Sequence, residues 1–570
     1  MSTTLQGRAS SPGVALAGAF VIHKLEVDTE AAATGTPEEE KARVDAALEE
    51  VENTLTELAE SKRDTLGDEA DIFLAHADFA GDPEIADMAH DAIDDGAGAN
   101  AAVSAAFDSF RKLLESSSDE YLAGRATDID DVRDQVLAVL AGAQDAPVPI
   151  ERSVIVAHEL TPSQTARLPR ELIAGVACAA GSPTSHAAIL ARSLGIPAVM
   201  GVTDLLADVS DGLLLALDGE AGTVIVAPGA DERSSYEQRI AEQEERNKRL
   251  AELRDVPGAT ADGHRVELAA NIGGLEDVEA AGEVGAEGSG LVRTEFLFQE
   301  AAEEPSIEEQ ADFYAKVLAG LPGHRVVFRT MDVGADKPLP FVVRDPEENP
   351  ALGVRGIRLG LAEPALLVNQ LRALLRARDP DADQGRLAIM FPLVSTPDEV
   401  RRARESLVAA AEAEGVDLDG IEVGVMIEVP AAALSAHRIA PLVDFFSVGT
   451  NDLLQYLFAA DRLLAEVADL PDVCDPDVLR LLSGVVEAAH ANDAWVGVCG
   501  ESAAEPASAA AYVGLGIDEL SMTPTAVPQL KDALRHVELA TLRGAVADAQ
   551  NAEDTTAARK ILRAALSGDG

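Results

Sequence analysis

Short apolar runs alternate with amphipathic stretches throughout the second half of the chain. After Asp262 the runs are VELAAN, GSGLVR, RVVFRT, LAIMFP, EVGVMIE, DFFSVG, AWVGVC and DELSMT. Strands that alternate with helices in this way are typical of an α/β fold, and eight of them over roughly 300 residues match the closed (β/α)8 arrangement. We therefore predict a TIM barrel over residues 262–570.

The C-terminal ends of barrel strands carry the chemistry in folds of this kind, so these ends mark candidate functional residues. In chain order they are Asn271, Arg293, Arg329, Pro392, Glu428, Asn451 with Asp452, Cys499 and Ser521. A single arginine or glutamate at a strand end commonly forms a surface ion pair, and a buried cysteine commonly acts as a small apolar residue. The convergence of these charged side chains and a thiol on one mouth favours an active site instead.

The charged residues of this set suit a small phosphorylated carboxylate bound with a divalent cation. Glu428 and Asp452 offer hard oxygen ligands of the kind that hold Mg²⁺, and no histidine stands at the strand ends to favour zinc. Arg293, Arg329 and Arg462 are predicted to clamp phosphate and carboxylate groups in bidentate fashion.

Two further side chains at the same mouth are candidates for the reaction itself. Asn451 can donate an N–H to a phosphate oxygen. Cys499 stands where a weak acid could give or take a proton at a substrate carbon, a task that suits an unperturbed thiol pKa of ~8.5.

The first half of the chain combines a helical pattern with a strand pattern. Residues 9–23 are strand-like, and the acidic sequence after them carries apolar residues spaced by four and three, at Val44, Leu48, Val51, Leu55 and Leu58. This spacing is typical of helices packed on one another and predicts a helical subdomain over residues 25–145. Buried strands recur after Ser153, so residues 1–24 and 146–229 are predicted to form one α/β domain around that insertion.

The segment 230–255 is almost wholly polar and has a helix-forming composition. It predicts a solvated linker helix within residues 230–261, between the α/β domain and the barrel. The domains on either side are therefore expected to move relative to each other.

One histidine stands at the start of a predicted helix, in the run GSPTSHAAILARSLGIPAVMG over residues 181–201. His186 follows hydroxyl residues and a proline that signal a helix start, and the helix is predicted to end near Gly195. A helix N-terminus favours a bound anion and disfavours protonation of an imidazole. From this segment alone, His186 is either a phosphate-accepting histidine or a polar residue in a helix cap.

The chain carries 100 acidic and 45 basic residues, a formal net charge of −55. Such a surface repels nucleic acid and anionic lipid, so neither nucleic acid nor a membrane is expected as a partner. A hydrophobic content of 47% argues against disorder, and the acidity is predicted to reflect adaptation to high salt. Scattered cysteines and the lack of an apolar run of ~18 residues predict a cytoplasmic protein.

Nearly the whole chain resembles enzyme I of the sugar phosphotransferase system, the phosphoenolpyruvate-protein phosphotransferase family. SSPGVALAGAF is similar to the family's opening strand, and DIFLAHADFAGDPEI with DEYLAGRATDIDDVRD is similar to its helical subdomain, which docks the carrier protein HPr. LTPSQTARL and TSHAAILARSLGIPAVMG resemble its phosphohistidine domain. The highly specific motifs of its substrate barrel are matched by GLVRTEFLF, RTMDVGADK, ENPALGVRGIR, IMFPLV, GVMIEVPAA, FFSVGTNDLLQY and GVCGE.

The resemblance implies a role for each matching position. His186 would be the phosphorylated histidine, Thr165 a residue that orients it, and Cys499 the residue that protonates enolpyruvate. The implied phosphoenolpyruvate contacts are Arg293, Arg329, Asn451, Asp452 and Arg462, with Arg355 in support, and the implied Mg²⁺ ligands are Glu428 and Asp452. The implied reaction passes a phosphoryl group from phosphoenolpyruvate to His186 and then to HPr. The family also implies a homodimer joined through the barrel.

The chain departs from the family pattern at a few positions. Pro183 stands where the family usually has arginine, Ala335 replaces a glycine, and Val429 replaces a threonine. The HPr-docking residues transfer least well, because an acidic docking surface at high salt must rely more on apolar contact.

Two other functions compete with this one. A phosphoenolpyruvate synthase or pyruvate phosphate dikinase would need a nucleotide-binding domain, and the 185 residues before His186 contain no Gly-rich phosphate loop followed by lysine. A phosphorelay scaffold without turnover would not need the intact set of His186, Glu428, Asp452 and Cys499.

Overall fold

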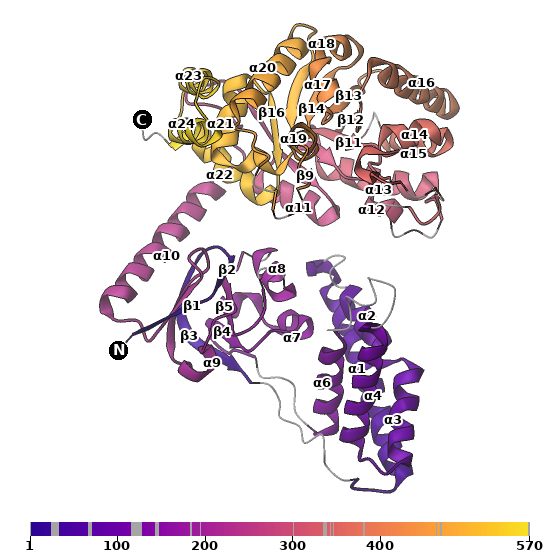
Figure 1. The fold of residues 1–570 in the computed structure, drawn as a ribbon, viewed down its shortest axis with the longest axis vertical. Helices are drawn as coiled ribbons and strands as arrows, with labels where there is room; N and C mark the ends of the chain where they lie inside the picture. Colours follow the sequence, from indigo (N-terminus) through magenta and orange to yellow (C-terminus); the bar gives the residue numbers. More distant parts are fainter. Residues whose placement is uncertain are drawn as a thin grey trace. The chain divides into compact units, whose positions relative to one another are not determined.

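The chain divides into two compact units, Met1–Glu245 and Arg246–Gly570. Figure 1 draws both, and each is described here by itself. The computed structural model describes residues 2–23, 33–66, 71–115, 128–142, 148–182, 185–193, 195–299, 301, 303–334, 339–342, 344–345, 347–379, 382, 384–462, 464, 466–467 and 470–567.

An eight-stranded sheet forms the centre of the first unit, in the order β1-β8-β7-β3-β4-β5-β6-β2. The strands are β1 (Thr3–Gln6), β2 (Arg8–Ser11), β3 (Val14–Ile22), β4 (Ser153–Ala157), β5 (Ile173–Cys178), β6 (Ala198–Met200), β7 (Leu214–Asp218) and β8 (Thr223–Val226). The pairs among β3, β4, β5 and β6 are parallel, and β1, β2, β7 and β8 join through antiparallel pairs. Every residue of β4 and β5 is buried, because separate apolar clusters pack on the two faces of the sheet.

The predicted helical part lies between β3 and β4 in the sequence. Its helices are α1 (Pro37–Leu66), α2 (Asp71–Ala80), α3 (Pro83–Asp94), α4 (Ala99–Glu115) and α6 (Asp128–Leu140). All five apolar residues of the predicted seam on α1 are buried: four lie in the shared core of these helices, and Leu58 lies in a small neighbouring cluster. The helical prediction is therefore confirmed for the described residues, while segments 25–32, 67–70, 116–127 and 143–145 of the predicted subdomain lie outside them.

Three short helices accompany the sheet, and a long polar one follows it. The short ones are α7 (Pro162–Arg167), α8 (His186–Ser193) and α9 (Leu205–Asp208). The predicted polar helix is present as α10 (Ala230–Ala251), and most of its residues are exposed. The division between the two units falls within α10.

The second unit is a closed barrel in which each strand pairs in parallel with its neighbours, in the order β10-β11-β12-β13-β14-β15-β16-β9. Its strands are β9 (Glu267–Ile272), β10 (Gly288–Val292), β11 (Arg325–Arg329), β12 (Arg386–Phe391), β13 (Glu422–Ile427), β14 (Phe445–Val448), β15 (Trp495–Val498) and β16 (Glu519–Met522). Each one coincides with a predicted apolar run, so the predicted TIM barrel is confirmed.

Helices surround these strands and bury their apolar faces against them in one large core (Figure 1). The longer ones are α11 (Leu275–Val284), α13 (Ile307–Gly320), α15 (Pro364–Ala377), α16 (Pro397–Glu414), α20 (Pro476–His490), α21 (Pro506–Leu515), α22 (Val527–Leu534), α23 (Leu539–Ala549) and α24 (Thr555–Ser567). Shorter helices lie in or beside the strand-to-helix connections: α12 (Phe296–Gln299), α14 (Ile357–Ala362), α17 (Pro430–Leu434), α18 (Ala436–Ile439) and α19 (Thr450–Phe458).

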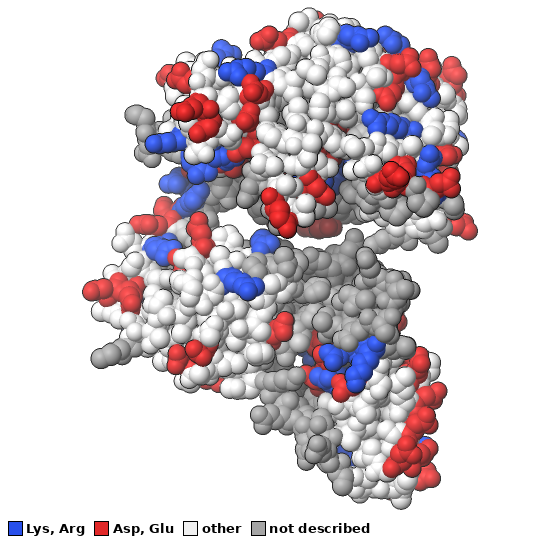
Figure 2. Space-filling view, viewed as in Figure 1, with Lys and Arg blue, Asp and Glu red and all other residues white. Residues whose placement is uncertain are grey.

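Acidic side chains are spread across the visible faces of both units rather than gathered in one patch (Figure 2). Among the described residues, no helix combines the length and the apolar character needed to span a bilayer.

Candidate active site

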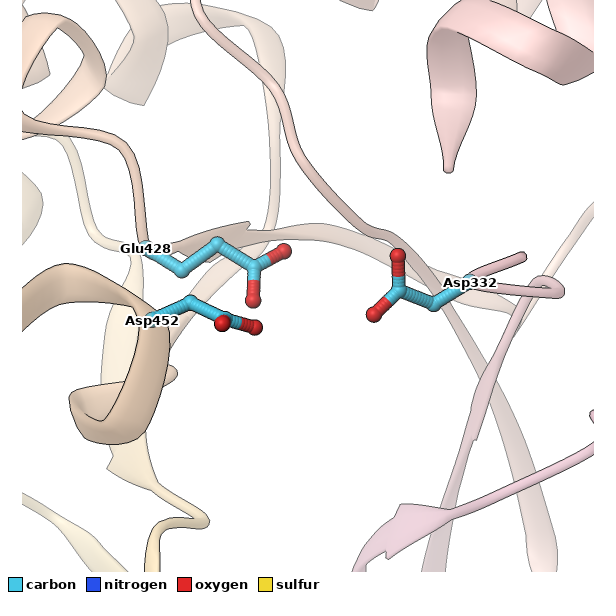
Figure 3. A group of neighbouring side chains, drawn as sticks. All are labelled: Asp332, Glu428 and Asp452. Carbon is cyan, nitrogen blue, oxygen red and sulfur yellow. The ribbon is translucent and has the colours of Figure 1, made fainter. Parts of the chain in front are cut away.

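Three buried carboxylates meet at the C-terminal mouth of the barrel, as Figure 3 shows. Glu428 directly follows β13, Asp452 lies in the first turn of α19 after β14, and Asp332 lies three residues beyond the end of β11. One oxygen from each lies within 4.8 Å of the others. The sequence predicted Glu428 and Asp452 as a pair of oxygen ligands, and the fold adds Asp332 beside them.

Glycine allows the chain to approach closely around these carboxylates. A Cβ atom on Gly449 would lie 2.8 Å from Met426 Sδ and 3.0 Å from Glu428 Oε2, so a larger residue would displace the Glu428 side chain. Gly356 has a φ of +57°, and a Cβ there would lie 2.9 Å from the Cβ of Leu393. Both positions need a residue without a side chain.

The three carboxylates repel one another, which shows in the raised pKa of Glu428. Burial and the nearby carboxylates of Asp332 and Asp452 raise the pKa of Glu428 to about 8, although Arg329 and a hydrogen bond from the Leu393 N–H oppose the shift. That N–H lies 2.6 Å from Glu428 Oε1. A hard divalent cation would relieve this repulsion, so the donor set fits Mg²⁺.

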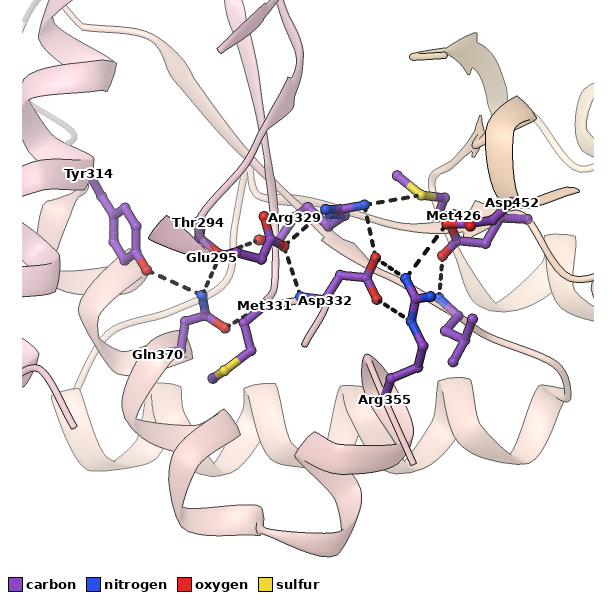
Figure 4. A network of polar contacts seen from close by, with 12 residues as sticks. Thr294, Glu295, Tyr314, Arg329, Met331, Asp332, Arg355, Gln370, Met426 and Asp452 are labelled. Carbon is purple, nitrogen blue, oxygen red and sulfur yellow. Dashed lines mark hydrogen bonds and ion pairs between the residues drawn. The ribbon is translucent and has the colours of Figure 1, made fainter. Parts of the chain in front are cut away.

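Two arginines face the carboxylates from inside the mouth (Figure 4). Arg329, the last residue of β11, places Nη2 3.0 Å from Glu295 Oε1 and Nη1 3.3 Å from Asp332 Oδ2. Arg355 places Nη2 2.8 Å from Asp332 Oδ2 and 3.6 Å from Asp452 Oδ2. Both guanidiniums are buried, and the surrounding carboxylates raise the pKa of Arg329 further above its usual range despite the opposing effect of burial.

The other predicted substrate contacts are more accessible. Arg462 is partly exposed, with Nη1 3.7 Å from Asp452 Oδ1. Arg293 is exposed just beyond the end of β10, and Asn451 is half-buried next to Asp452 on α19. The structure thus gathers the predicted barrel residues at one mouth, with the arginines at different depths.

Cys499 directly follows β15 and is buried at the same mouth. Burial raises the pKa of its thiol to about 11, although the nearby Arg329 charge lowers it. The Cys499 carbonyl accepts a 3.1 Å hydrogen bond from Asn271 Nδ2, and Ser521 Oγ donates to Asn271 Oδ1 at 2.7 Å. Two other predicted strand-end residues, Asn271 and Ser521, therefore hold the backbone at Cys499. Because its pKa lies well above 7, the thiol is protonated at neutral pH.

A second layer of polar residues holds the strand ends that carry the arginines. Gln370 on α15 accepts a hydrogen bond from the Met331 N–H at 3.0 Å and donates to Thr294 Oγ1 at 3.0 Å and to the Tyr314 hydroxyl at 3.2 Å. Thr294 Oγ1 donates in turn to the Arg329 carbonyl at 2.9 Å. Gln370 and Thr294 are both fully buried, so this layer leaves β10 and β11 little freedom at their ends (Figure 4).

The predicted phosphohistidine segment belongs to the first unit. Helix α8 begins at His186, as predicted, whereas the side chain of His186 and residues 183–184, including Pro183, lie outside what the structure describes. Thr165 lies on α7, which packs against α8, and its hydroxyl donates to the Thr161 carbonyl at 2.8 Å. Thr161 caps α7 in a reciprocal arrangement with Gln164.

Comparisons with known proteins match the whole of this arrangement. Residues 247–539 match the family described as PEP-utilising enzyme, PEP-binding domain. Residues 6–125 match the N-terminal family of PEP-utilising enzymes, and residues 149–222 match their mobile domain. The phosphoenolpyruvate-protein phosphotransferase of Priestia megaterium is 42% identical over 548 residues, 95% of each chain. The chain belongs to the phosphoenolpyruvate-protein phosphotransferase family.

Another member of the phosphotransferase family, from Haloferax volcanii, is 44% identical over 509 residues, 88% of each chain. Among solved structures, an Enzyme I (nEIt) protein studied by NMR is 34% identical, covering 42% of this chain and 99% of that one, with a TM-score of 0.37. The sequence matches confirm the resemblance to enzyme I and favour it over a synthase or dikinase. Salt adaptation and the homodimer stay predictions.

Sequence reasoning missed two acidic residues of this phosphotransferase site, Asp332 and Glu295. Both lie two or three residues beyond an arginine that was identified at a strand end, in the runs RTMD and RTE. Neither residue was among the predicted strand ends, and both carboxylates come from the connections that follow β10 and β11. A search extended by one turn beyond each strand would have found both.

Proposed function

We propose that this phosphotransferase takes the phosphoryl group of phosphoenolpyruvate onto His186 and passes it to a histidine of an HPr-like carrier. The observation that carries the proposal is the joint presence, at one barrel mouth, of buried Glu428 and Asp452, the arginines 329 and 355, and the protonated thiol of Cys499. The mouth thus combines positive charge that can bind phosphate and carboxylate groups, oxygen ligands for a cation, and an acid that can protonate a substrate carbon.

The arginines would bind the substrate before any bond changes. Arg329 and Arg355 would bind from within the mouth and Arg293 and Arg462 from its more exposed side, with Asn451 donating to a phosphate oxygen. Mg²⁺ held by Glu428 and Asp452 would supply charge that offsets the oxygens of the transferring group.

The transfer itself breaks the bond between the phosphorus and the enol oxygen and forms a bond from phosphorus to a ring nitrogen of His186. The enolate of pyruvate is then protonated at its terminal carbon by the Cys499 thiol, which regains its proton from solvent. A thiol pKa of about 11 favours this role, because the group is fully protonated at neutral pH. Thr165 would orient the imidazole from α7.

The wider assignment follows from the same proposal. Residues 1–24 and 146–229 would form the phosphohistidine domain, 25–145 the HPr-binding subdomain, 230–261 the linker and 262–570 the phosphoenolpyruvate-binding and dimerisation domain. His186 and the barrel mouth belong to different units, so the proposed reaction needs the imidazole to reach the mouth, and a polar linker helix would permit such a domain movement. We place the reaction in the cytoplasm and expect a homodimer.

The proposal is tested with the full chain, ³²P-labelled phosphoenolpyruvate and Mg²⁺ in high salt, without ATP. We expect acid-labile label on the protein that is lost in His186→Ala and that transfers to an added HPr-like carrier. Label that requires ATP, or that survives in His186→Ala, would contradict the proposal. Cys178→Ala, which removes a buried side chain of the same sheet domain, serves as the control and should retain the label.

A further inference from the structure

The three carboxylates of the mouth do not have the same surroundings. Asp332 is engaged on both oxygens: Oδ1 accepts a hydrogen bond from Arg355 Nε at 3.3 Å, and Oδ2 accepts one from Arg355 Nη2 at 2.8 Å. Oδ2 also lies 3.3 Å from Arg329 Nη1. Asp332 therefore contacts the Arg355 guanidinium through both carboxylate oxygens and the Arg329 guanidinium through Oδ2.

Glu428 and Asp452 make much looser contacts with cations. Asp452 has its arginine neighbours at 3.6 Å and 3.7 Å, beyond hydrogen-bond distance. Glu428 forms no ion pair within the described part of the chain and accepts its hydrogen bond from a backbone N–H. In Figure 3 these two side chains lie side by side, and Asp332 faces them from the opposite side of the group.

The backbone of Asp332 is held as firmly as its carboxylate. Its N–H donates to Glu295 Oε1 at 2.8 Å, and the same oxygen accepts a hydrogen bond from Arg329 Nη2 at 3.0 Å. The preceding residue, Met331, donates its N–H to buried Gln370. Glu295 and Asp332 thus enclose the Arg329 guanidinium from two sides, and both carboxylates are nearly inaccessible to solvent.

We propose that Asp332 is a positioning residue that orients Arg329 and Arg355 toward phosphoenolpyruvate, and that Glu428 and Asp452 hold the cation without it. The inference rests on the proposed function, whose substrate and cation it takes over. If Asp332 turned toward the cation, its carboxylate would move away from buried guanidinium nitrogens that lie 2.8 and 3.3 Å from its oxygens. Buried Arg355 would then lose a partner that contacts two of its nitrogens, and buried Arg329 would lose one of its two carboxylate partners, which opposes such a rearrangement.

The contacts with Asp332 also give Arg329 and Arg355 an advantage in binding substrate. A guanidinium on a flexible side chain loses conformational freedom when it binds a ligand. Where a fixed carboxylate already holds the guanidinium, that entropy is lost on folding and does not weaken ligand binding. The Asp332 grip on Nε and Nη2 fixes the plane of Arg355, as the bidentate geometry requires. Substrate then meets donors that are already oriented.

Three full-length variants separate positioning from ligation: Asp332→Asn, Glu428→Gln and Asp452→Asn. Mn²⁺ binding without substrate, measured by electron paramagnetic resonance, should weaken by about tenfold or more in the last two and by less than about threefold in Asp332→Asn. Binding of phosphoenolpyruvate without metal, measured by calorimetry in EDTA, should weaken by about tenfold or more in Asp332→Asn. In turnover, Asp332→Asn should raise KM more than it lowers kcat.

The inference is overturned if Asp332→Asn weakens Mn²⁺ binding as much as Asp452→Asn does, or if it leaves metal-free phosphoenolpyruvate binding unchanged. Glu295→Gln provides a second variant should Asp332→Asn fail to fold, because Glu295 supports Arg329 and Asp332 from outside the three-carboxylate group. It should show the same pattern, with Mn²⁺ binding kept and metal-free substrate binding weakened, and the reverse pattern overturns the inference. Failure of wild-type protein to accept label from phosphoenolpyruvate would instead contradict the proposed function.

Discussion

The guanidinium of Arg325 stacks on the indole of Trp495, with its central carbon 3.9 Å from the ring centroid, at the N-terminal end of the barrel. Arg325 also lies 3.2 Å from Glu267, 3.1 Å from Glu422 and 3.4 Å from Glu519. One cation thus contacts three acidic side chains at the end of the barrel opposite the candidate active site. The arrangement contributes to stability rather than to chemistry, in agreement with the usual roles of the two barrel faces.

Glu519 gives the barrel a pH-dependent stability. Burial, together with Glu267 and in spite of Arg325, raises its pKa from 4.5 to about 8. The fold therefore retains a proton that the unfolded chain releases near pH 4.5, so this contribution is complete below pH 4.5 and is lost as the pH rises toward 8. The free energy of unfolding of the wild type should fall as the pH rises from 5 to 8, and Glu519 should contribute about 1.4 kcal/mol to this fall for each unit by which its pKa is raised. Glu519→Gln removes that contribution, so its free energy of unfolding should fall less over the same range.

The measurement is urea unfolding followed by the fluorescence of Trp495, the single tryptophan of the chain, which reports on the barrel. Exposed Glu538→Gln is the matched control and should keep the slope of the wild type. Equal slopes in wild type and Glu519→Gln would show that Glu519 ionises freely in the fold.

Lys531 anchors the chain just beyond α10 to the barrel. Its buried Nζ donates to the carbonyls of Leu253, Arg254 and Gly285 at 3.3, 2.8 and 2.6 Å. Lys531→Met keeps the aliphatic chain and leaves these carbonyls without their donor, which should lower the free energy of unfolding by about 1–3 kcal/mol. Denaturant unfolding measures the loss, and exposed Lys560→Met should stay within about 0.5 kcal/mol of wild type. A loss of the same size in both variants would contradict the anchor.

Cys499 should matter for turnover and not for binding. Cys499→Ala removes the acid that we propose protonates the enolate, so pyruvate release in the presence of carrier should slow by about 10²–10⁴-fold, while phosphoenolpyruvate affinity changes little. Cys474→Ala removes another buried thiol of the second unit and is the control. Near-normal pyruvate release from Cys499→Ala would assign the proton to another group.

The thiol pKa values also predict slow alkylation. Burial raises the pKa of Cys178 and of Cys474 to about 12, and that of Cys499 to about 11. Folded protein at pH 7.5 should therefore react with iodoacetamide far more slowly than protein unfolded in urea, since the thiolate is the nucleophile. Mass spectrometry of the labelled peptides gives the rates, and rapid modification of Cys499 in the folded protein would contradict its protonated state.

Salt should stabilise the fold, because a formal net charge of −55 repels itself when unscreened. The temperature of unfolding is expected to rise between 0.2 M and 2 M KCl by an amount that sucrose at equal osmolality does not reproduce. An unfolding temperature that does not change with KCl concentration would contradict the prediction that salt stabilises the fold by screening its negative charge.

Local patterns were sufficient for much of the fold. The apolar runs predicted all barrel strands because a parallel strand buried on both faces must be apolar along its whole length. The seam from Val44 to Leu58 predicted a packed helix for a similar reason, and the proline and hydroxyl residues before His186 predicted where α8 begins. Each of these features depends on neighbours within a few residues in the sequence.

The sequence by itself also determined which strand ends carry reactive groups, since Glu428, Cys499 and Arg329 lie at or directly after a recognisable strand. Only the tertiary structure decided how those groups divide their tasks. Asp332 stands beside Glu428 because the parallel pairing of β11, β12 and β13 puts the connections after β11 and β13 at the same mouth, although the two residues are 96 positions apart in the sequence. No local pattern records such a distance, because side-chain contacts between distant loops depend on the path of the whole closed sheet.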